Sequence, residues 1–274
     1  MDNLMDKETL DMLHSVEIEI MDEFVRICKK NNLQYFLIGG TLLGAVRHNG
    51  FIPWDDDLDL AMPREDYEKF LELAKVELSP DFLIDNFNNN KLYYLNFTKI
   101  RKKNTLFVQD FQLNYDGPKG IWIDIFPMDG LKKEKGVLQD IKIRFIKLLR
   151  SIAHYKSGIF LGNNKIFLKK IIGLLFAPIP TSSIMKLADN LMKSNLGRET
   201  AYMVNIASQY DFHKQTIKRE KFFPTKELEF EGKMYSVPND YKYFLERLYG
   251  NYMKLPPVEK RITHNPIKLD FSVK

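Results

Sequence analysis

An acidic segment with a two-residue period constrains the fold of this chain more than any other feature. Residues 57–62 read DLDLAM, so acidic and apolar side chains alternate. Such alternation is typical of a β-strand with one buried face, because successive side chains point to opposite faces of a sheet. Asp57 and Asp59 then share one face, and the apolar residues lie on the other. The chain must therefore build a sheet with an apolar face behind two neighbouring carboxylates.

Two like charges that point the same way repel, which predicts a cation between Asp57 and Asp59. Hard divalent ions prefer oxygen ligands, and Mg²⁺ needs only one or two protein carboxylates when substrate phosphates complete its shell. Mn²⁺ is the alternative ion. The competing interpretation is a solvated acidic turn, which suits Asp55 and Asp56 better than the alternating pair. The pattern favours a phosphoryl-transfer site.

A second metal ion, or a base, usually requires a third carboxylate from elsewhere in the chain. Asp124 is the candidate, because it is the one charge within the apolar run Trp122–Pro127. An unpaired carboxylate in a buried strand would be costly. The alternative is a buried structural hydrogen bond. Asp129 is expected to be a turn residue.

A pair of glycines precedes the acidic segment. Gly39-Gly40-Thr41 follows a short apolar run, as expected at a strand-to-helix junction. Backbone N–H groups at a helix start attract anions, and glycine permits close approach. A merely structural tight turn is the alternative. We predict that these residues contact substrate phosphate.

Several cationic residues are candidates for holding phosphate oxygens, as paired hydrogen bonds or as point charges. A surface charge is the alternative for each. The candidates are Arg47, His48, Arg64, Lys99 and Arg101. The last two are separated by one residue on an expected strand, so both should face one way.

The rest of the sequence contains both helical and strand patterns. Expected helices cover residues 7–31, 41–47, 64–77 and 240–248, with a helical stretch over 132–195 that breaks near 177–180. Expected strands cover residues 35–38 and 57–62 and four apolar or aromatic runs between 82 and 129, with a hairpin that turns at Glu231-Gly232. This order favours a mixed α/β or α+β core with a helical addition.

Composition and charge narrow the class of protein. With 45% hydrophobic residues the chain can bury a sizeable core, and the net charge is +5. The excess is local: residues 131–176 hold eleven Lys or Arg and two acidic residues. This basic region could face phosphates, nucleic acid or an anionic membrane, or be a solvated helix face. No nucleic-acid-binding motif is present, so we expect no nucleic-acid partner.

Targeting signals are not evident either. The acidic first residues lack the apolar stretch of a signal peptide, and no window is long and apolar enough for a membrane span. A cytoplasmic location is expected.

The run GGTLLGAVRHNGFIPWDDDLDLAMPREDYEKF, residues 39–70, closely resembles the LicD family of phosphocholine transferases, which also includes fukutin-type enzymes. DIFPMD at 124–129 and YGNYMKLPPVEKR at 249–261 also resemble family segments. The resemblance implies an α+β, nucleotidyltransferase-like fold: a mixed central sheet flanked by helices, with an added helical region. It makes Asp57 and Asp59 metal ligands, Asp124 the third acid, and Asp55 a further site residue.

The resemblance also implies a reaction. The expected function is Mg²⁺-dependent transfer of phosphocholine from CDP-choline to a sugar hydroxyl of a teichoic acid or lipopolysaccharide precursor, with release of CMP. The nearest alternative is transfer of another nucleotide-activated group, namely ribitol phosphate, glycerol phosphate or a nucleotidyl group. A choline headgroup should meet aromatic faces. The candidates, each with core packing as the alternative, are Trp54, Trp122, Tyr93 and Tyr94.

A lipid-linked glycan acceptor would be met at the inner membrane face. The basic, Phe-, Leu- and Ile-rich segments at 143–160 and 167–180 suit a helix that lies on anionic headgroups. The alternative is a helical lobe packed on the sheet. We expect a catalytic core over residues 1–131, a basic helical region over 132–200 that faces membrane or acceptor, and a C-terminal segment over 201–274 that packs back on the core.

Overall fold

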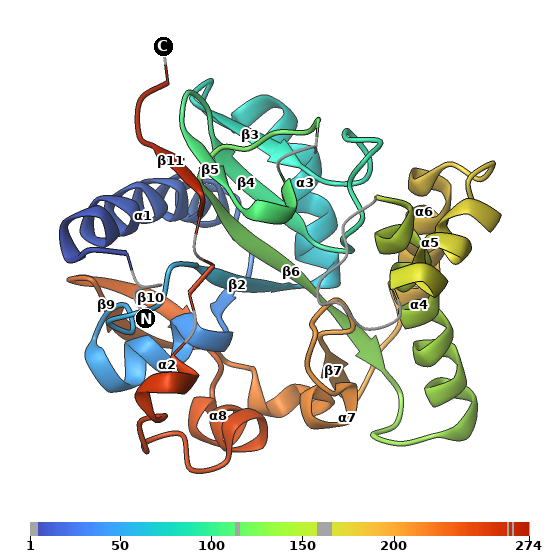
Figure 1. The fold of residues 1–274 in the computed structure, drawn as a ribbon. Helices are drawn as coiled ribbons and strands as arrows, with labels where there is room; N and C mark the ends of the chain where they lie inside the picture. The colour runs from blue at the N-terminus through green and yellow to red at the C-terminus, as the bar shows by residue number, and fades with distance from the viewer. Residues whose placement is uncertain (1–4, 113–115, 158–165, 262, 265, 274) are drawn as a thin grey trace.

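A seven-stranded mixed sheet forms the centre of the molecule (Figure 1). The computed structural model describes residues 5–112, 116–157, 166–261, 263–264 and 266–273. The sheet order is β1-β2-β6-β4-β3, with β7 paired to β6 and β8 paired to β7. The strands of this sheet are β1 (Phe36–Leu37), β2 (Asp59–Pro63), β3 (Phe82–Asp85), β4 (Thr98–Lys102), β6 (Trp122–Leu131), β7 (Tyr202–Val204) and β8 (Ile217–Lys218). Two further pairs consist of β9 (Lys226–Phe230) with β10 (Lys233–Val237), and β5 (Leu106–Val108) with β11 (Lys268–Asp270).

The helices flank this sheet. They are α1 (Lys7–Lys30), α2 (Gly39–His48), α3 (Arg64–Glu77), α4 (Val137–Lys156), α5 (Ile166–Leu175), α6 (Thr181–Met192), α7 (Phe212–Gln215) and α8 (Tyr241–Tyr249). Short 3-10 helices cover η1 (Asp110–Gln112), η2 (Arg219–Lys221) and η3 (Val258–Lys260). In Figure 1, α4, α5 and α6 gather at one end of the sheet, beyond the C-terminal half of β6.

The acidic segment contributes β2, as its alternation predicts, and β2 pairs with β6 within the sheet. β2 runs parallel to β6, with Asp59 opposite Asp124, and β4 runs antiparallel to β6, with Lys99 opposite Asp124. The strand begins at Asp59, so Asp57 lies just before it rather than within it. The pairing reaches one residue further, because the carbonyl of Leu58 accepts the N–H of Asp124 at 2.8 Å.

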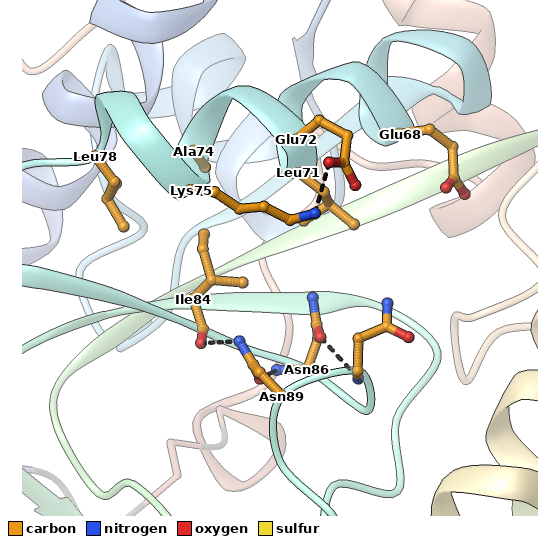
Figure 2. A pocket seen from close by; sticks show the side chains of 10 residues that line it. Glu68, Leu71, Glu72, Ala74, Lys75, Leu78, Ile84, Asn86 and Asn89 are labelled. Carbon is orange, nitrogen blue, oxygen red and sulfur yellow. Dashed lines mark hydrogen bonds and ion pairs between the residues drawn. The ribbon is translucent and has the colours of Figure 1, made fainter.

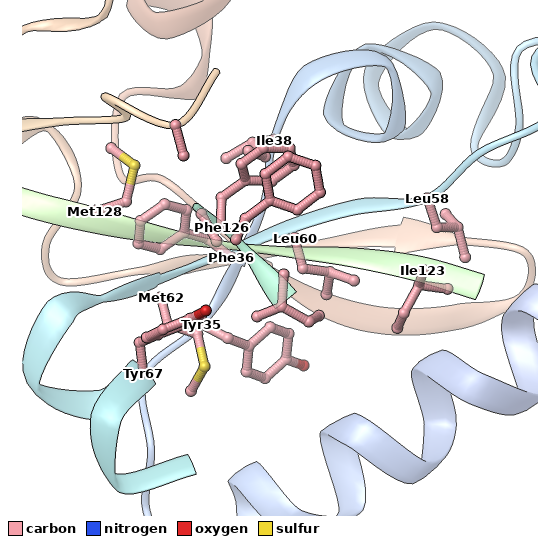
Figure 3. Close-up of a cluster of buried hydrophobic side chains, with 14 of the residues drawn as sticks. Tyr35, Phe36, Ile38, Leu58, Leu60, Met62, Tyr67, Ile123, Phe126 and Met128 are labelled. Carbon is pink, nitrogen blue, oxygen red and sulfur yellow. The ribbon is translucent and has the colours of Figure 1, made fainter. Parts of the chain in front are cut away.

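The apolar half of the alternation is in the core. Leu58, Leu60 and Met62 are fully buried, and Figure 3 shows them in one cluster with residues of β6 and of α3. The helices α1 and α3 lie against this part of the sheet. Burial of each such side chain contributes about 1.5–3 kcal/mol relative to exposure. The same burial fixes the register, because a slip of one residue would exchange the apolar and the acidic faces.

Several expected elements are confirmed with shifted ends. The first helix begins after Asp6, whose carboxylate accepts the N–H of Thr9 at 2.9 Å, as an N-cap should. The helix after the glycines begins at Gly39 rather than at residue 41. Of the long run at 92–103, only Thr98–Lys102 is a strand. The hairpin turns at Glu231 and Gly232, both with positive φ.

The expected α+β fold class is confirmed. One pairing was not predicted: β11, near the C-terminal end of the described residues, pairs with β5. β7 pairs with β6 at the end away from Asp124. The division into a core, a basic helical region and a C-terminal segment stays a prediction. Within the described residues, no helix is long and apolar enough to cross a membrane.

Candidate active site

The glycine pair lies against two carboxylates. Gly39 has a φ of +57°, a conformation that L side chains rarely adopt. A Cβ atom on Gly39 would lie 2.7 Å from Oδ2 of Asp59, and one on Gly40 would lie 2.5 Å from Oδ2 of Asp55. Any side chain here would therefore displace a carboxylate. The glycines thus leave room for the carboxylates of Asp59 and Asp55. Their contact with substrate phosphate stays a prediction.

A third carboxylate, that of Asp57, acts electrostatically on both Asp55 and Asp59. Burial and then the charge of Asp57 raise the pKa of Asp55 to about 8. Burial, followed by the charges of Asp57, Asp124 and Asp55, raises the pKa of Asp59 well above its usual range. Thr41 holds Asp59 in place, because its hydroxyl accepts the N–H of Asp59 at 2.8 Å. Asp55 therefore belongs to the carboxylate group rather than to a solvated turn.

Asp124 lies across the strand pair and carries its own cation. Its Oδ1 is 2.6 Å from Nζ of Lys99. Among the described residues, no three His, Cys, Asp or Glu side chains are arranged to hold a metal ion. The oxygen donors of Asp57 and Asp59 nevertheless fit Mg²⁺, which takes one or two protein carboxylates and completes its shell with phosphates and water. Their mutual repulsion is the observation that favours a cation there.

The C-terminal tail supplies a residue that the sequence did not reveal. Asp56 is buried and accepts both the backbone N–H of His264, at 2.8 Å, and its ring Nδ1, at 3.0 Å. The ring Nε2 is 3.8 Å from Oδ2 of Asp57. Although burial opposes it, the bond to Asp56 and the charge of Asp57 raise the pKa of His264 to about 9. His264 thus places a positive charge beside the carboxylates.

Glu17 of α1 is a second residue missed from the sequence. It is fully buried, and burial together with the charges of Asp57 and Asp56 raises its pKa well above the usual range. Its Oε2 has no hydrogen-bond partner among the described residues. Glu17 lies seven residues after Leu10 and three before Ile20, so its place in the apolar helical stripe was the available signal.

Two of the predicted phosphate ligands are used within the fold. Arg64 binds both oxygens of Asp129, at 2.7 and 3.0 Å, and Oδ1 of Asp189 at 2.9 Å. Asp129 is thus a buried partner rather than a turn residue. Arg101 binds Asp85 at 2.7 Å. Both arginines are buried, and their predicted contact with substrate stays a prediction that this geometry does not favour.

The other predicted cations are closer to the site or more open. Lys99 is placed in the site by its ion pair with Asp124. The guanidinium of Arg47 donates to the carbonyl of Tyr252 at 3.1 Å. Burial lowers the pKa of Arg47, and the negative charge of Asp55 opposes that shift. His48 is exposed at the end of α2.

Three of the four predicted choline-binding aromatics already have partners. Arg261 lies over the ring of Trp54 at 4.2 Å, and Lys99 lies over Trp122 at 4.3 Å. Tyr93 is buried, and Tyr94 stacks on His154 with ring centroids 5.0 Å apart.

A different aromatic pair lies beside the carboxylates. The rings of Tyr210 and Tyr249 meet edge to face with centroids 5.9 Å apart, and their hydroxyls are 3.4 Å apart. Burial is the largest cause of the raised pKa of each phenol, and the charges of Asp59 and Asp55 contribute to both. The two residues are distant in sequence, so no local pattern could have paired them.

A cavity of about 610 Å³ lies away from this site, between α3 and β3 (Figure 2). Its polar groups bond to one another: Lys75 to Glu72, and Asn89 to the carbonyl of Ile84. It contains none of the site carboxylates, so we place the chemistry at the acidic strand.

Comparison with known proteins decides the family. Residues 32–144 match the family described as LicD/FKTN/FKRP, nucleotidyltransferase domain. Over 276 aligned residues the chain is 30% identical to the lipopolysaccharide cholinephosphotransferase LicD of Haemophilus influenzae, with 95% of this chain and 97% of that protein covered. The chain belongs to the LicD family.

The predicted resemblance to LicD proteins is thereby confirmed. A shorter match joins this chain to the ribitol 5-phosphate transferase FKRP of human and mouse, 48% identical over 53 residues, which is 19% of this chain and 11% of either relative. The matched LicD domain, residues 32–144, contains the glycine pair and the carboxylates of Asp55, Asp57, Asp59 and Asp124. His264, Tyr210 and Tyr249 lie outside it.

Proposed function

We propose that this LicD-family chain transfers phosphocholine from CDP-choline to a sugar hydroxyl of a lipopolysaccharide or teichoic acid precursor, with release of CMP. The observation that carries the proposal is the group of half-buried carboxylates at Asp55, Asp57 and Asp59, with Asp59 opposite Asp124 and the group against the glycine pair. The full-length similarity to a cholinephosphotransferase supports the choice of transferred group.

Divalent metal is part of this proposal. Asp57 and Asp59 would hold Mg²⁺ or Mn²⁺, with Asp55 beside them, and the ion would neutralise charge on the donor's phosphate oxygens. The protein prepares this position through Thr41, which fixes the backbone of Asp59, and through the tail, in which His264 fixes Asp56. These contacts keep the carboxylates in place before substrate arrives, so that little reorganisation is needed during transfer.

The chemical step is an in-line displacement at phosphorus. The acceptor hydroxyl oxygen forms a bond to the choline-bearing phosphorus, and the bond from that phosphorus to the bridging oxygen breaks. CMP leaves with the electron pair. In this step Asp124 would accept the hydroxyl proton, and Lys99, 2.6 Å from its Oδ1, supports that carboxylate. The same lysine provides a positive charge near the transferred group.

The choline headgroup is assigned to Tyr210 and Tyr249, the aromatic pair next to the carboxylates. Quaternary ammonium ions bind to aromatic faces with about 0.5–2 kcal/mol per contact. We expect Tyr249→Leu to raise the KM for CDP-choline by about tenfold with a small effect on kcat, since each 1.4 kcal/mol is tenfold. Steady-state kinetics against CDP-choline measure this.

Tyr241→Leu is the matched control, because Tyr241 lies on the same helix, eight residues before Tyr249. CDP-ethanolamine, which lacks the methyl groups, should lose its disadvantage in Tyr249→Leu. An unchanged KM for CDP-choline in that variant would remove the headgroup assignment.

A second candidate function rests on the FKRP match. In this second function the donor carries ribitol phosphate. Donors that carry glycerol phosphate or a nucleotidyl group would give related reactions. Incubation of the protein with Mg²⁺, acceptor glycan and each nucleotide donor distinguishes these reactions. Our proposal expects CMP and choline-bearing glycan from CDP-choline. Release of pyrophosphate, or turnover with CDP-ribitol alone, would contradict it.

We also propose that the protein works in the cytoplasm, at the inner membrane face, where a lipid-linked acceptor would be found. The support is an exposed apolar surface on two basic helices, which we call the α4–α5 surface. Its members are Val137, Leu138, Ile141, Phe145 and Leu148 of α4 and Phe167, Leu168, Leu174 and Leu175 of α5. The five α4 residues share one helical face. Leu138 is 83% exposed and Phe167 is 78% exposed.

Binding to vesicles tests this surface. Leu138→Asp should reduce cosedimentation with vesicles of phosphatidylethanolamine and phosphatidylglycerol by about tenfold, because one buried leucine contributes about 1.5–3 kcal/mol. The control is Val76→Asp on α3, because Val76 is equally exposed at 83%. Equal binding of both variants and the unchanged protein would exclude the α4–α5 surface as the contact.

A further inference from the structure

A second pocket lies on α4, outside the carboxylate site. It has a volume of about 320 Å³ and is formed by three segments: α4, the loop between β3 and β4, and the loop between β7 and α7. Its lining consists of Lys147, Arg150, Ser151 and His154 from α4, Tyr94 and Leu95 from the first loop, and Ser208 and Gln209 from the second. The α4 residues follow the spacing of a single helical face. Among these described lining residues there is no Asp or Glu.

The charge of this pocket is positive and not neutralised from within. The guanidinium of Arg150 donates to the carbonyls of Ile206 and Ala207, at 2.8 and 2.5 Å, and among the described residues no carboxylate pairs with it. Burial lowers the pKa of Arg150 to about 10, so it remains cationic at neutral pH. A cation that is partly removed from water without a counter-ion is costly, and an anionic ligand would relieve that cost.

Two more donors point to a ligand of this kind. The ring Nε2 of His154 is buried and has no hydrogen-bond partner among the described residues. Nζ of Lys147 donates to the carbonyl of Tyr210 at 3.2 Å, which leaves further N–H groups on the ammonium. Ser151 lines the pocket next to them, and its hydroxyl donates to the carbonyl of Lys147 at 2.9 Å. Imidazole, ammonium and guanidinium donors together suit the oxygens of a phosphate group.

Both loops of the pocket also carry a residue on which the charges of the proposed reaction site act. Gln209 lines the pocket, and the next residue, Tyr210, lies beside the carboxylates. Tyr94 lines it, and the phenol of the preceding Tyr93 feels the charge of Asp124. The pocket and the site are thus linked by residues that are neighbours in sequence. The lining face of α4 is next to its exposed apolar face, on which we expect the lipid-linked acceptor to approach.

We propose that the pocket formed by Lys147, Arg150, Ser151 and His154 binds a phosphate ester of the acceptor glycan, so that the enzyme selects an anionic acceptor. This inference rests on the proposed function, which it deepens by naming the acceptor class. The donor is the other possible source of a phosphate ester. It is assigned instead to the carboxylate site, where Asp57 and Asp59 would hold the divalent cation that neutralises its diphosphate.

Direct binding tests the pocket without any turnover. Inorganic phosphate should raise the melting temperature of the intact protein, and Lys147→Gln should reduce that shift by half or more. Lys186→Gln on α6 is the matched control, because Lys186 is exposed and does not line the pocket. A phosphate shift that is absent from the unchanged protein, or undiminished in Lys147→Gln, overturns the pocket assignment. This result is independent of whether CDP-choline is the donor.

Kinetics then identify the source of the phosphate. With a phosphorylated glycan as acceptor, Lys147→Gln should raise the acceptor KM by about tenfold, as expected for one charge-assisted hydrogen bond, and leave the KM for CDP-choline unchanged. With the same glycan after phosphatase treatment, the variant and the unchanged protein should be alike. A rise confined to the KM for CDP-choline would overturn the acceptor assignment in favour of the donor. Failure of the proposed function would instead appear as no CMP release by the unchanged protein.

Discussion

Asp59→Asn is expected to lower kcat/KM for phosphocholine transfer by about 10³-fold or more, since loss of metal-centred charge stabilisation costs several kcal/mol. Asparagine keeps the volume of the side chain and its position opposite Asp124. What it removes is one of the two anionic oxygens proposed to share a cation. The measurement is the initial rate of CMP release at saturating Mg²⁺.

Loss of folding is not expected to explain that result. Burial, and then the like charges of its neighbours, raise the pKa of Asp59, so in the metal-free protein its ionised form is disfavoured by the fold. Asp59→Asn should therefore leave the free energy of unfolding unchanged or higher without Mg²⁺. Asp81→Asn, a change at an exposed turn residue, is the control for both quantities. A variant at Asp59 with near-normal turnover would refute the assigned role.

Arg64→Ala is expected to lower the free energy of unfolding by about 3–5 kcal/mol, because breaking a buried ion pair leaves uncompensated charge behind. The carboxylate of Asp129 loses its partner, and that of Asp189 keeps only Lys193, at 3.0 Å. They join three segments of the chain, since Arg64 begins α3, Asp129 lies on β6 and Asp189 lies on α6. Urea unfolding, followed by circular dichroism, measures the change.

The same variant separates two roles for this arginine. If Arg64 bound substrate phosphate, as the sequence suggested, the main effect would be on KM and the unfolding curve would change little. Arg198→Ala provides the control, because Arg198 is exposed and such surface changes are usually within about 0.5 kcal/mol. A loss of less than about 1 kcal/mol in Arg64→Ala would contradict the structural role, since surface-type effects are of that size.

The fold was predictable where local patterns determine it. The alternation in residues 57–62 located the central strand, and its apolar members, such as Leu60, are fully buried as expected. The 3.6-residue pattern of α1 and the Glu231-Gly232 turn were equally readable. The pairing of β11 with β5 was not, because Lys268 and Val108 are joined only by tertiary contact. Strand pairings between distant segments leave no periodic trace in either segment.

The acidic residues of the site could be predicted from the sequence, and the residues that surround them could not. Asp59 and Asp124 lie opposite one another as the carboxylate argument requires. The role of His264 could not be predicted from sequence, because it depends on a contact with Asp56, 208 residues away. The signal of Glu17 was present, as a charge within an apolar helical stripe, and was not used. Sequence can also not tell an arginine that binds phosphate from one that is buried in an ion pair, which is why Arg64 was assigned to substrate.

Binding of Mn²⁺, followed by electron paramagnetic resonance, tests the central claim most directly, namely that Asp57 and Asp59 jointly hold a divalent cation next to the donor diphosphate. The account predicts that CDP-choline strengthens Mn²⁺ binding to the unchanged protein, and that Asp57→Asn and Asp59→Asn each abolish this gain while Asp81→Asn keeps it. Undiminished, donor-dependent Mn²⁺ binding in both site variants would contradict it.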